Sequence, residues 1–188
     1  MKKSKILFAL LLTSAALVSC GANKTEISFA KAKEIATENS KKEITYTSAT
    51  VTTKYTKFDL TIPESVLALL GKTQEEFKQE MLTSQGIELN KETKQELTNA
   101  AEIQAMRLDV SLFDDEKEAE GVTFYVEKNC LSFTAQYEEE GALIKATAAY
   151  NEYNYLTKTE QETKMSMAVG TEKLDMNLGA VISVSYKK

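Results

Sequence analysis

The second half of the sequence alternates apolar and polar residues in successive runs, which only short turn segments separate. A period of two places neighbouring side chains on opposite faces of a β-strand, so each run predicts a strand with one buried face. The links are too short for the crossover that a parallel pair needs, and consecutive strands must therefore be antiparallel. This half predicts a meander of about six strands with one apolar face. The predicted strands cover residues 106–112, 122–127, 131–137, 144–150, 155–167 and 174–186.

An earlier stretch, residues 44–62, also alternates with a period of two and is rich in threonine. Threonine and the other β-branched residues favour strands, so this stretch predicts one further, half-buried strand. Its apolar row changes phase between Tyr55 and Phe58. Because one extra residue in a strand shifts the alternation, we expect a β-bulge or corner near Thr56 and Lys57.

Four segments in the first hundred residues carry helix signals. Ser28 is a good N-cap for a run with apolar residues at helical spacing, and Pro63 suits the first turn of a short helix. Thr73 and Glu76 have the spacing of a capping box. Asn90 is expected to cap a fourth segment. The predicted helices cover residues 28–39, 63–70, 73–86 and 90–99.

A sheet with one apolar face must bury that face against a second layer. The helices before residue 99 are the available cover. We therefore expect an α+β fold, a curved antiparallel meander of about six to seven strands with the N-terminal helices packed on its concave face. The chain has 188 residues, 43% of them hydrophobic, which suffices for the core of one domain. That single domain is expected over residues 27–188.

The charged residues exclude several classes of function. The formal net charge is −5, and Arg107 is the only arginine. Nucleic-acid binding needs a basic face rich in arginine, so we expect no nucleic-acid partner. The sequence has no histidine, which excludes Ser-His-Asp and Cys-His catalysis and histidine zinc sites. We expect no catalytic residues, no metal and no other cofactor.

The first twenty residues have the form of a bacterial secretion signal. Three lysines within residues 2–5 precede an apolar run over residues 6–18. This run is shorter than the about 20 residues that a membrane-spanning helix needs. It ends in Leu17-Val18-Ser19-Cys20, which resembles the lipobox of bacterial lipoproteins.

The lipoprotein resemblance implies a processed and anchored chain. Residues 1–19 would be removed as a signal peptide, and residues 20–26 would hold the lipidated Cys20 and a tether. Two acyl chains on Cys20 anchor a protein stably without a transmembrane helix. The domain is then expected on the extracytoplasmic face of a cell membrane. Its formal charge falls from −5 to −8, because the leader contains three lysines and no acidic residue.

Lipidation of Cys20 leaves Cys130 without a partner for an internal disulfide. An activated thiol needs a base or a positive environment, and the sequence offers no histidine. We therefore expect Cys130 to be a small strand residue rather than a reactive thiol.

Two groups of residues are candidates for binding. The acidic residues 114–120 could offer oxygen ligands to Ca²⁺, but they lack EF-hand spacing and include Lys117, so a solvated turn is favoured. Tyr150, Tyr153 and Tyr155 cluster around one predicted hairpin. Their rings and hydroxyl groups could form an interaction surface, although cross-strand packing explains the same pattern and is favoured.

Two stretches of the mature chain resemble small lipoproteins of low-GC bacteria. They are residues 27–35, after the tether, and residues 150–158, a strand–turn–strand in which glycine often occupies the place of Asn154. The order of elements is also similar to the LolA and LppX lipoprotein carriers, whose half-barrel and helices enclose acyl chains. The polar residues 157–164 depart from that pattern, because they supply few apolar side chains for an acyl-lined wall.

Three functions follow as hypotheses. The first is a non-enzymatic, membrane-anchored lipoprotein that binds an apolar ligand, such as a lipid, between sheet and helices. The alternative is an interaction or scaffold module for another envelope protein. The third is a carboxylate-based hydrolase, which needs two converging acids in a cleft. An apolar cavity above about 300 Å³ between helices and sheet would favour the first, since ligand sites usually have at least that volume.

Overall fold

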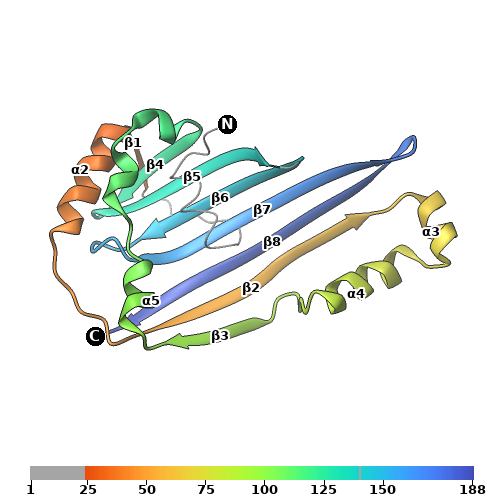
Figure 1. The fold of residues 1–188 in the computed structure, drawn as a ribbon, viewed down its shortest axis with the longest axis horizontal. Helices are drawn as coiled ribbons and strands as arrows, with labels where there is room; N and C mark the ends of the chain where they lie inside the picture. Colours follow the sequence, from red (N-terminus) through yellow and green to blue (C-terminus); the bar gives the residue numbers. More distant parts are fainter. Residues whose placement is uncertain (1–23, 140) are drawn as a thin grey trace.

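Five consecutive antiparallel strands form the meander at the centre of the protein (Figure 1). The computed structural model describes residues 24–139 and 141–188. Over these residues the sheet has eight strands in the order β1-β4-β5-β6-β7-β8-β2-β3 and is open at both edges. The strands are β1 (Thr25–Ile27), β2 (Ser48–Thr61), β3 (Glu92–Leu97), β4 (Val122–Glu127), β5 (Cys130–Glu139), β6 (Ala142–Tyr150), β7 (Leu156–Val169) and β8 (Glu172–Lys187). The α-helices are α2 (Phe29–Ser40), α3 (Glu64–Leu70), α4 (Gln74–Ser84) and α5 (Ala100–Ala105), and the 3₁₀ turns are η1 (Val110–Phe113) and η2 (Glu116–Ala119).

The α+β class and the antiparallel sheet are confirmed, with eight strands where six to seven were expected. One of the additional strands, β1, pairs antiparallel with β4 through Thr25 and Val126. The sheet therefore begins inside residues 20–26, the range expected for the tether. A strand this short was not apparent from the alternation of the sequence.

The prediction of a helix over residues 90–99 is wrong, because Glu92–Leu97 form strand β3. This segment pairs with β2 from Ala49 to Lys54, and nearly all of its side chains are exposed. Its single large apolar residue, Leu97, gives a helix no face to bury. The free edge of β2 instead offers backbone hydrogen bonds to the segment.

The prediction of a strand over residues 106–112 is also wrong. The Met106 carbonyl accepts a hydrogen bond from the Leu156 N–H at 3.0 Å, and the Leu108 N–H donates to the Asn154 carbonyl at 2.8 Å. The chain then turns into η1, where the carboxylate of Asp109 accepts a hydrogen bond from the Ser111 N–H at 2.9 Å. This turn directs two consecutive apolar side chains into the core, which a strand cannot do because its side chains alternate.

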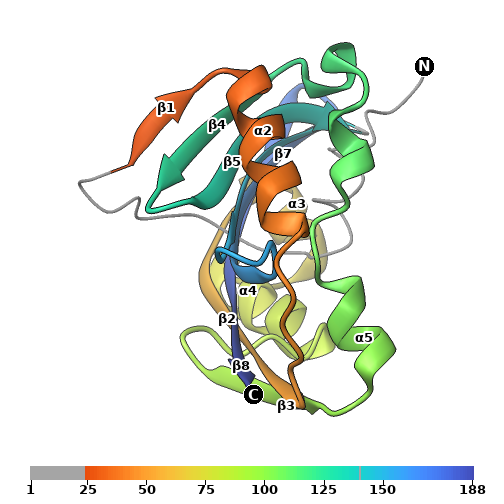
Figure 2. The same cartoon turned by 90° about the vertical axis from the view of Figure 1, so that its left-hand side faces the viewer.

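The strand register places nearly all large apolar strand residues on one face of the sheet. Residues directly opposite each other in neighbouring strands point to the same side. Phe133 on β5 is therefore on the same face as Ala148 on β6 and Ile182 on β8. Viewed on edge in Figure 2, α2 and α5 lie on the same side of the sheet. The other face is mostly polar.

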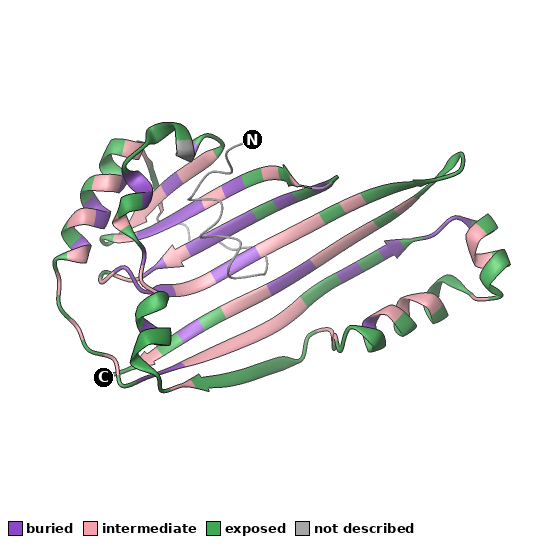
Figure 3. Ribbon diagram, viewed as in Figure 1, coloured by how far each residue is buried: buried purple, intermediate pink, exposed green. Residues whose placement is uncertain are grey.

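The apolar face carries three main clusters, and their burial differs along the sheet (Figure 3). The first lies under α2 and η1 and contains most of the fully buried side chains, including Phe113 and Phe133. The second lies at the C-terminal end, where Ile103 of α5 meets Val184. The third lies under α3 and α4 at the far end of the long strands and is mostly half-buried.

The predicted bulge is confirmed. The register between β2 and β8 shifts between Tyr55 and Lys57, so Thr56 is the extra residue. Gly179 faces the bulge, and a Cβ atom there would lie 3.1 Å from the Lys57 Cβ and 3.2 Å from the Thr56 Oγ1. Because real Cβ atoms rarely approach so closely, glycine fits this position best.

Candidate functional site

Cys20, the predicted lipidation site, lies outside the described residues. The three tyrosines of the predicted interaction surface lie on and beside the β6–β7 turn, and two of them are buried. Tyr150 is 8% exposed in the first core cluster, where its ring centroid lies 5.4 Å from that of Phe133. Burial raises the pKa of the Tyr150 hydroxyl, which stays neutral at physiological pH.

Tyr155 is 4% exposed and belongs to the second cluster. Its ring packs edge-on against Tyr46 and Tyr186, with centroids 5.0 and 5.4 Å away, and its hydroxyl donates to Gln104 Oε1 at 2.7 Å. Tyr153 is half-buried beside this cluster. The hairpin thus points its tyrosines into the fold, and an interaction surface here would depend on Tyr153.

Cys130 is a half-buried free cysteine at the start of β5. Burial raises the pKa of its thiol, and the neighbouring Glu152 adds to this shift while Lys42 opposes it. A raised pKa keeps the sulfur protonated and weakly nucleophilic at neutral pH.

The acidic residues 114–120 form two turns rather than an ion-binding loop. The Asp115 carboxylate accepts a hydrogen bond from the Lys117 N–H at 3.0 Å and so caps η2. Asp114 pairs with Lys33 of α2 at 3.3 Å. Within residues 24–139 and 141–188, no group of three or more His, Cys, Asp or Glu residues is arranged to hold a metal ion.

A hollow of about 660 Å³ lies at one edge of the sheet, between β1, the start of α2, η2 and β4. We call it the edge pocket. It opens to solvent and is not a closed cavity. Its apolar floor consists of Ile27, Phe29, Ala119, Val122 and Phe124.

Three of these floor residues owe their positions to the short strand β1 and its pairing. Ile27 lies directly opposite Phe124 in the register of β1 and β4. Ser28 then caps α2, where its hydroxyl accepts a hydrogen bond from the Lys31 N–H, and Phe29 begins the helix. The ring centroids of Phe29 and Phe124 lie 5.8 Å apart.

Behind the floor, aromatic rings continue into the core. Phe113 of η1 lies 5.6 Å from Phe29 and 5.8 Å from Phe124, and Phe124 lies 5.3 Å from Phe133, measured between ring centroids. Such tilted and edge-to-face contacts are the favourable geometries for aromatic pairs. Because Phe124 is only 3% exposed, the apolar surface open to a ligand comes from the half-buried Ile27, Phe29 and Val122, and the buried rings hold these residues in place.

The rim of the edge pocket is acidic. Four carboxylates, from Glu26, Asp115, Glu116 and Glu120, and one ammonium group, from Lys117, line it. This excess of negative charge disfavours an anionic ligand, although salt screens exposed charges over about 8–10 Å. The pocket suits a neutral or cationic molecule with an apolar part.

A hollow of about 410 Å³ lies near the far end of β2, β6, β7 and β8. Its lining combines the apolar Leu143, Met165 and Met176 with polar residues that include Asp59 and Asp175. Lys57 Nζ lies 3.1 Å from Asp59 and 3.6 Å from Glu162. The pKa of Glu162 is lowered, mainly because the Asn177 amide donates a hydrogen bond to its carboxylate. General acid–base catalysis by two carboxyl groups needs one of them to have a raised pKa. These contacts favour a charged, solvated face, and we do not propose a hydrolase.

Comparisons with known proteins assign no family. No protein-family model, curated protein or solved structure matches the chain. Over the described residues, no helix combines the length and the hydropathy needed to cross a bilayer. The likeness to the LolA and LppX carriers therefore rests on the order of elements alone.

Sequence reasoning missed the edge pocket. Its floor comes from Ile27 at the start of the expected domain, from a predicted helix, from the acidic turn and from a predicted strand, and its rim includes Glu26 of the expected tether. The signal that could have found it is the pair Ile27 and Phe29 on either side of a helix cap, immediately before the domain core. Two apolar residues at the entry to a domain indicate a packed chain rather than a free tether.

Proposed function

We propose that the protein is a non-enzymatic lipoprotein, anchored through Cys20 to the extracytoplasmic face of a membrane, which binds the apolar part of a small molecule in the edge pocket. The observation that carries the binding role is the edge pocket itself, about 660 Å³ in volume, with the half-buried Ile27, Phe29 and Val122 in its lining. The anchor is supported by the leader and by the lipobox-like sequence that ends at Cys20.

The acidic rim supports the same proposal by restricting the charge that a bound ligand can carry. Burial of the apolar part of the ligand would contribute roughly 25 cal/mol for each Å² of apolar surface removed from water. The carboxylates would select against negatively charged amphiphiles. A neutral or cationic amphiphile fits both parts of the pocket.

Replacement of Cys20 by serine is expected to abolish lipidation. Cells that make the wild-type chain should incorporate labelled palmitate into it and retain it in the membrane fraction. The Cys20→Ser chain should incorporate no label and should leave that fraction. The Cys130→Ser chain is the matched control and should behave as the wild type. Equal labelling of the Cys20→Ser chain would contradict the anchor.

The Val122→Thr substitution is expected to weaken ligand binding about 5- to 30-fold, because it buries a hydroxyl without a partner under the bound apolar group at a cost of about 1–2 kcal/mol. The two side chains have nearly the same shape, so the fold should persist. The measurement is fluorescence titration of the mature domain with neutral N-phenyl-1-naphthylamine.

Val126→Thr is the matched control for this titration. Val126 is on the same strand and face and is also half-buried, but it lies beyond the residues that line the edge pocket. Equal loss of affinity in both variants, or no saturable binding to the wild type, would refute the role of the pocket. An anionic naphthalene sulfonate should bind more weakly than the neutral probe, and the difference should shrink at high salt.

A further inference from the structure

The methionines of the mature chain gather at one end of the molecule. The sequence has six methionines, and Met1 belongs to the leader. Of the other five, Met165 and Met167 lie in the second half of β7, Met176 lies in the first half of β8, and Met81 lies on α4. The β7–β8 turn and α4 are at the same end of the sheet (Figure 1). Several thioether sulfur atoms are thus concentrated in one region.

Three of these methionines share one face of the β7–β8 hairpin. Met165 lies directly opposite Met176 in the register, and Met167 is two residues further along β7. Directly opposite side chains of an antiparallel pair have Cβ atoms about 4.5–5.5 Å apart, and diagonal neighbours about 7–8 Å apart remain within reach of long side chains. Each methionine side chain has three rotatable bonds. The three sulfur atoms can therefore converge on one point above the hairpin.

The spacing of the three methionines suits a single metal ion. With metal–sulfur bonds of about 2.3 Å, three sulfur atoms in a plane around one ion lie about 4 Å from one another. This distance is close to the Cβ separation of a directly opposite pair. Met165 and Met176 can bind one ion from their positions in the register, and Met167 completes the set from the diagonal position.

The surroundings of the pair are uncharged and open to solvent on one side. Met165 lies opposite Ala142 on β6, and Met176 lies opposite Leu60 on β2. Ala142 and Leu60 are buried, whereas Met165 and Met176 are half-buried and Met167 is 48% exposed. An ion can therefore enter from solvent and be held next to apolar side chains.

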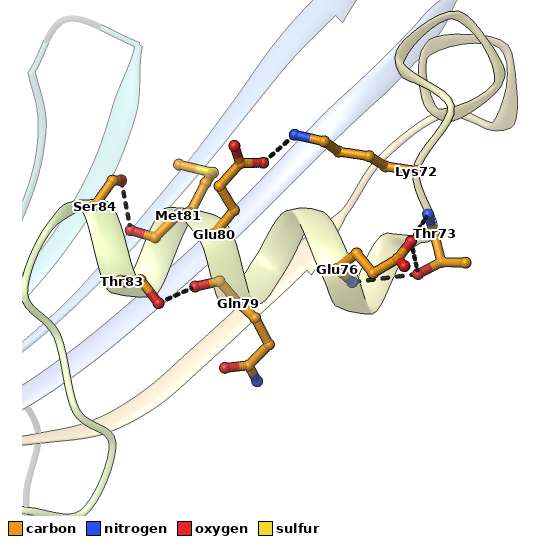
Figure 4. A network of polar contacts seen from close by, with 8 residues as sticks. All are labelled: Lys72, Thr73, Glu76, Gln79, Glu80, Met81, Thr83 and Ser84. Carbon is orange, nitrogen blue, oxygen red and sulfur yellow. Dashed lines mark hydrogen bonds and ion pairs between the residues drawn. The ribbon is translucent and has the colours of Figure 1, made fainter.

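Helix α4 provides a formed wall beside Met176. Met81 and Met176 both pack on the third cluster. In Figure 4 the Met81 side chain leaves α4 on the side opposite to that of Gln79. Thr73 and Glu76 form a complete capping box at the start of this helix, where the Glu76 carboxylate accepts the Thr73 N–H at 2.8 Å. The packing of Met176 on the third cluster therefore limits its freedom before any ion binds.

The donor set determines which ion is favoured. Thioether sulfur is a soft ligand and selects Cu(I), whereas Ca²⁺ and Mg²⁺ require oxygen ligands. Thioethers are also uncharged, so they do not neutralise the ion, and a monovalent ion costs less to desolvate than a divalent one. We expected no metal because the sequence lacks histidine, but thioether donors need none.

We propose that Met165, Met167 and Met176 form a thioether site for one Cu(I) ion, for which Ag(I) is a redox-stable analogue. Binding changes no oxidation state, and no proton is released because thioethers carry none. The site needs neither the anchor nor the edge pocket, so it goes beyond the proposed function and does not depend on it. The competing explanation is that the three methionines only fill space, in which case leucine would serve equally well.

Nuclear magnetic resonance of the methionine methyl groups tests this proposal. The mature chain carries Cys20→Ser and Cys130→Ser, so that no thiol competes, and is labelled with ¹³C-methyl methionine and titrated with silver nitrate in chloride-free buffer. The methyl signals of Met165, Met167 and Met176 should shift and saturate at one equivalent of Ag(I). The signal of Met106 should stay in place, because its sulfur lies at the other end of the sheet, 3.6 Å from the Tyr186 hydroxyl.

Leucine variants separate metal binding from packing. Met165→Leu, Met167→Leu and Met176→Leu should each weaken Ag(I) binding at least tenfold, whereas Met106→Leu, the matched control, should change it less than twofold. Leucine retains most of the volume of methionine, so the thermal unfolding of the metal-free variants should stay close to that of the parent chain.

Cu(I) provides the second measurement. Under anaerobic conditions with ascorbate it should displace Ag(I), and X-ray absorption of the copper complex should show only sulfur neighbours. Shifts that never saturate, equal affinity in all the leucine variants, an equal loss in Met106→Leu, or nitrogen and oxygen neighbours of the copper would overturn the proposal. The edge pocket is tested by a different probe, so failure of either site leaves the other unaffected.

Discussion

Replacement of Phe133 by alanine is expected to lower the free energy of unfolding by about 3–5 kcal/mol, the range for a fully buried aromatic side chain. Phe133 is 2% exposed on β5. Its ring centroid lies 5.3 Å from Phe124, 5.4 Å from Tyr150 and 6.0 Å from Phe113. These neighbours belong to β4, β6 and η1, so they cannot all move inward to fill the cavity.

Equilibrium unfolding in urea of the mature chain carrying Cys20→Ser measures this effect. Phe133→Leu retains most of the volume and should cost less than about 1.5 kcal/mol. Leu143→Ala is the control on the other face of the sheet, where the side chain is 37% exposed, and it should cost less than about 1 kcal/mol. Similar losses for Phe133→Ala and Leu143→Ala would show that this ring cluster is not the centre of the core.

The strands around Phe133 were predictable because their sequence shows both the alternation of apolar and polar residues and the short turns between the strands. Leu131, Phe133 and Ala135 alternate with polar residues, and Lys128 and Asn129 adopt the positive φ that a tight turn requires. One face is buried, so a slip of one residue would expose every apolar side chain. Local pattern and tertiary packing therefore agree in this half of the chain.

Residues 92–97 and 106–112 were assigned wrongly for one common reason, which is that their neighbours decide their structure. Glu92–Leu97 have almost no apolar pattern, and the open edge of β2 selects a strand. Leu108 and Leu112 do alternate, but Asp109 caps a turn that sends Leu112 and Phe113 into the first cluster together. Long-range contacts override weak local preferences in both segments.

The candidate site was less predictable than the fold, because it is built from segments that are distant in sequence. Ile27 and Phe124 become neighbours only when β1 adds to the edge of the sheet. The acidic rim looked like an isolated turn, since sequence spacing does not show which face of that turn meets an apolar floor. The exposure of Leu69 likewise depends on how α3 packs against the sheet. The spacing of apolar residues along a helix does not show which of its ends other elements cover.

The only arginine of the chain, Arg107, joins three segments that have little regular structure. Its Nη2 donates to the carbonyl oxygens of Ser40, the last residue of α2, and of Lys42, at 2.9 and 3.0 Å. Its Nε donates to the Tyr153 carbonyl at 3.1 Å, and the guanidinium carbon lies 5.6 Å from the centroid of the Tyr155 ring. One planar group thus satisfies the carbonyls of two turns and covers an aromatic face.

Arg107→Met is therefore expected to destabilise the protein by about 2–4 kcal/mol, since hydrogen bonds from charged donors contribute about 1.5–3 kcal/mol each and the partly buried carbonyls would lose their partner. Arg107→Lys should recover less than half of this loss. A single ammonium group cannot reproduce the fork of donors or the stacking on Tyr155. Urea unfolding measures both changes.

Lys33→Met is the matched control, because it removes a cation from an exposed ion pair with Asp114 and should cost about 0–1 kcal/mol. Amide hydrogen exchange locates the effect of Arg107→Met. Exchange should accelerate at residues 41–47 and 151–155 more than in β5 or β6, because the lost contacts hold the turns and not the sheet. Unchanged exchange in both turns, or full stability of Arg107→Lys, would mean that packing of the tyrosines alone holds these segments in place.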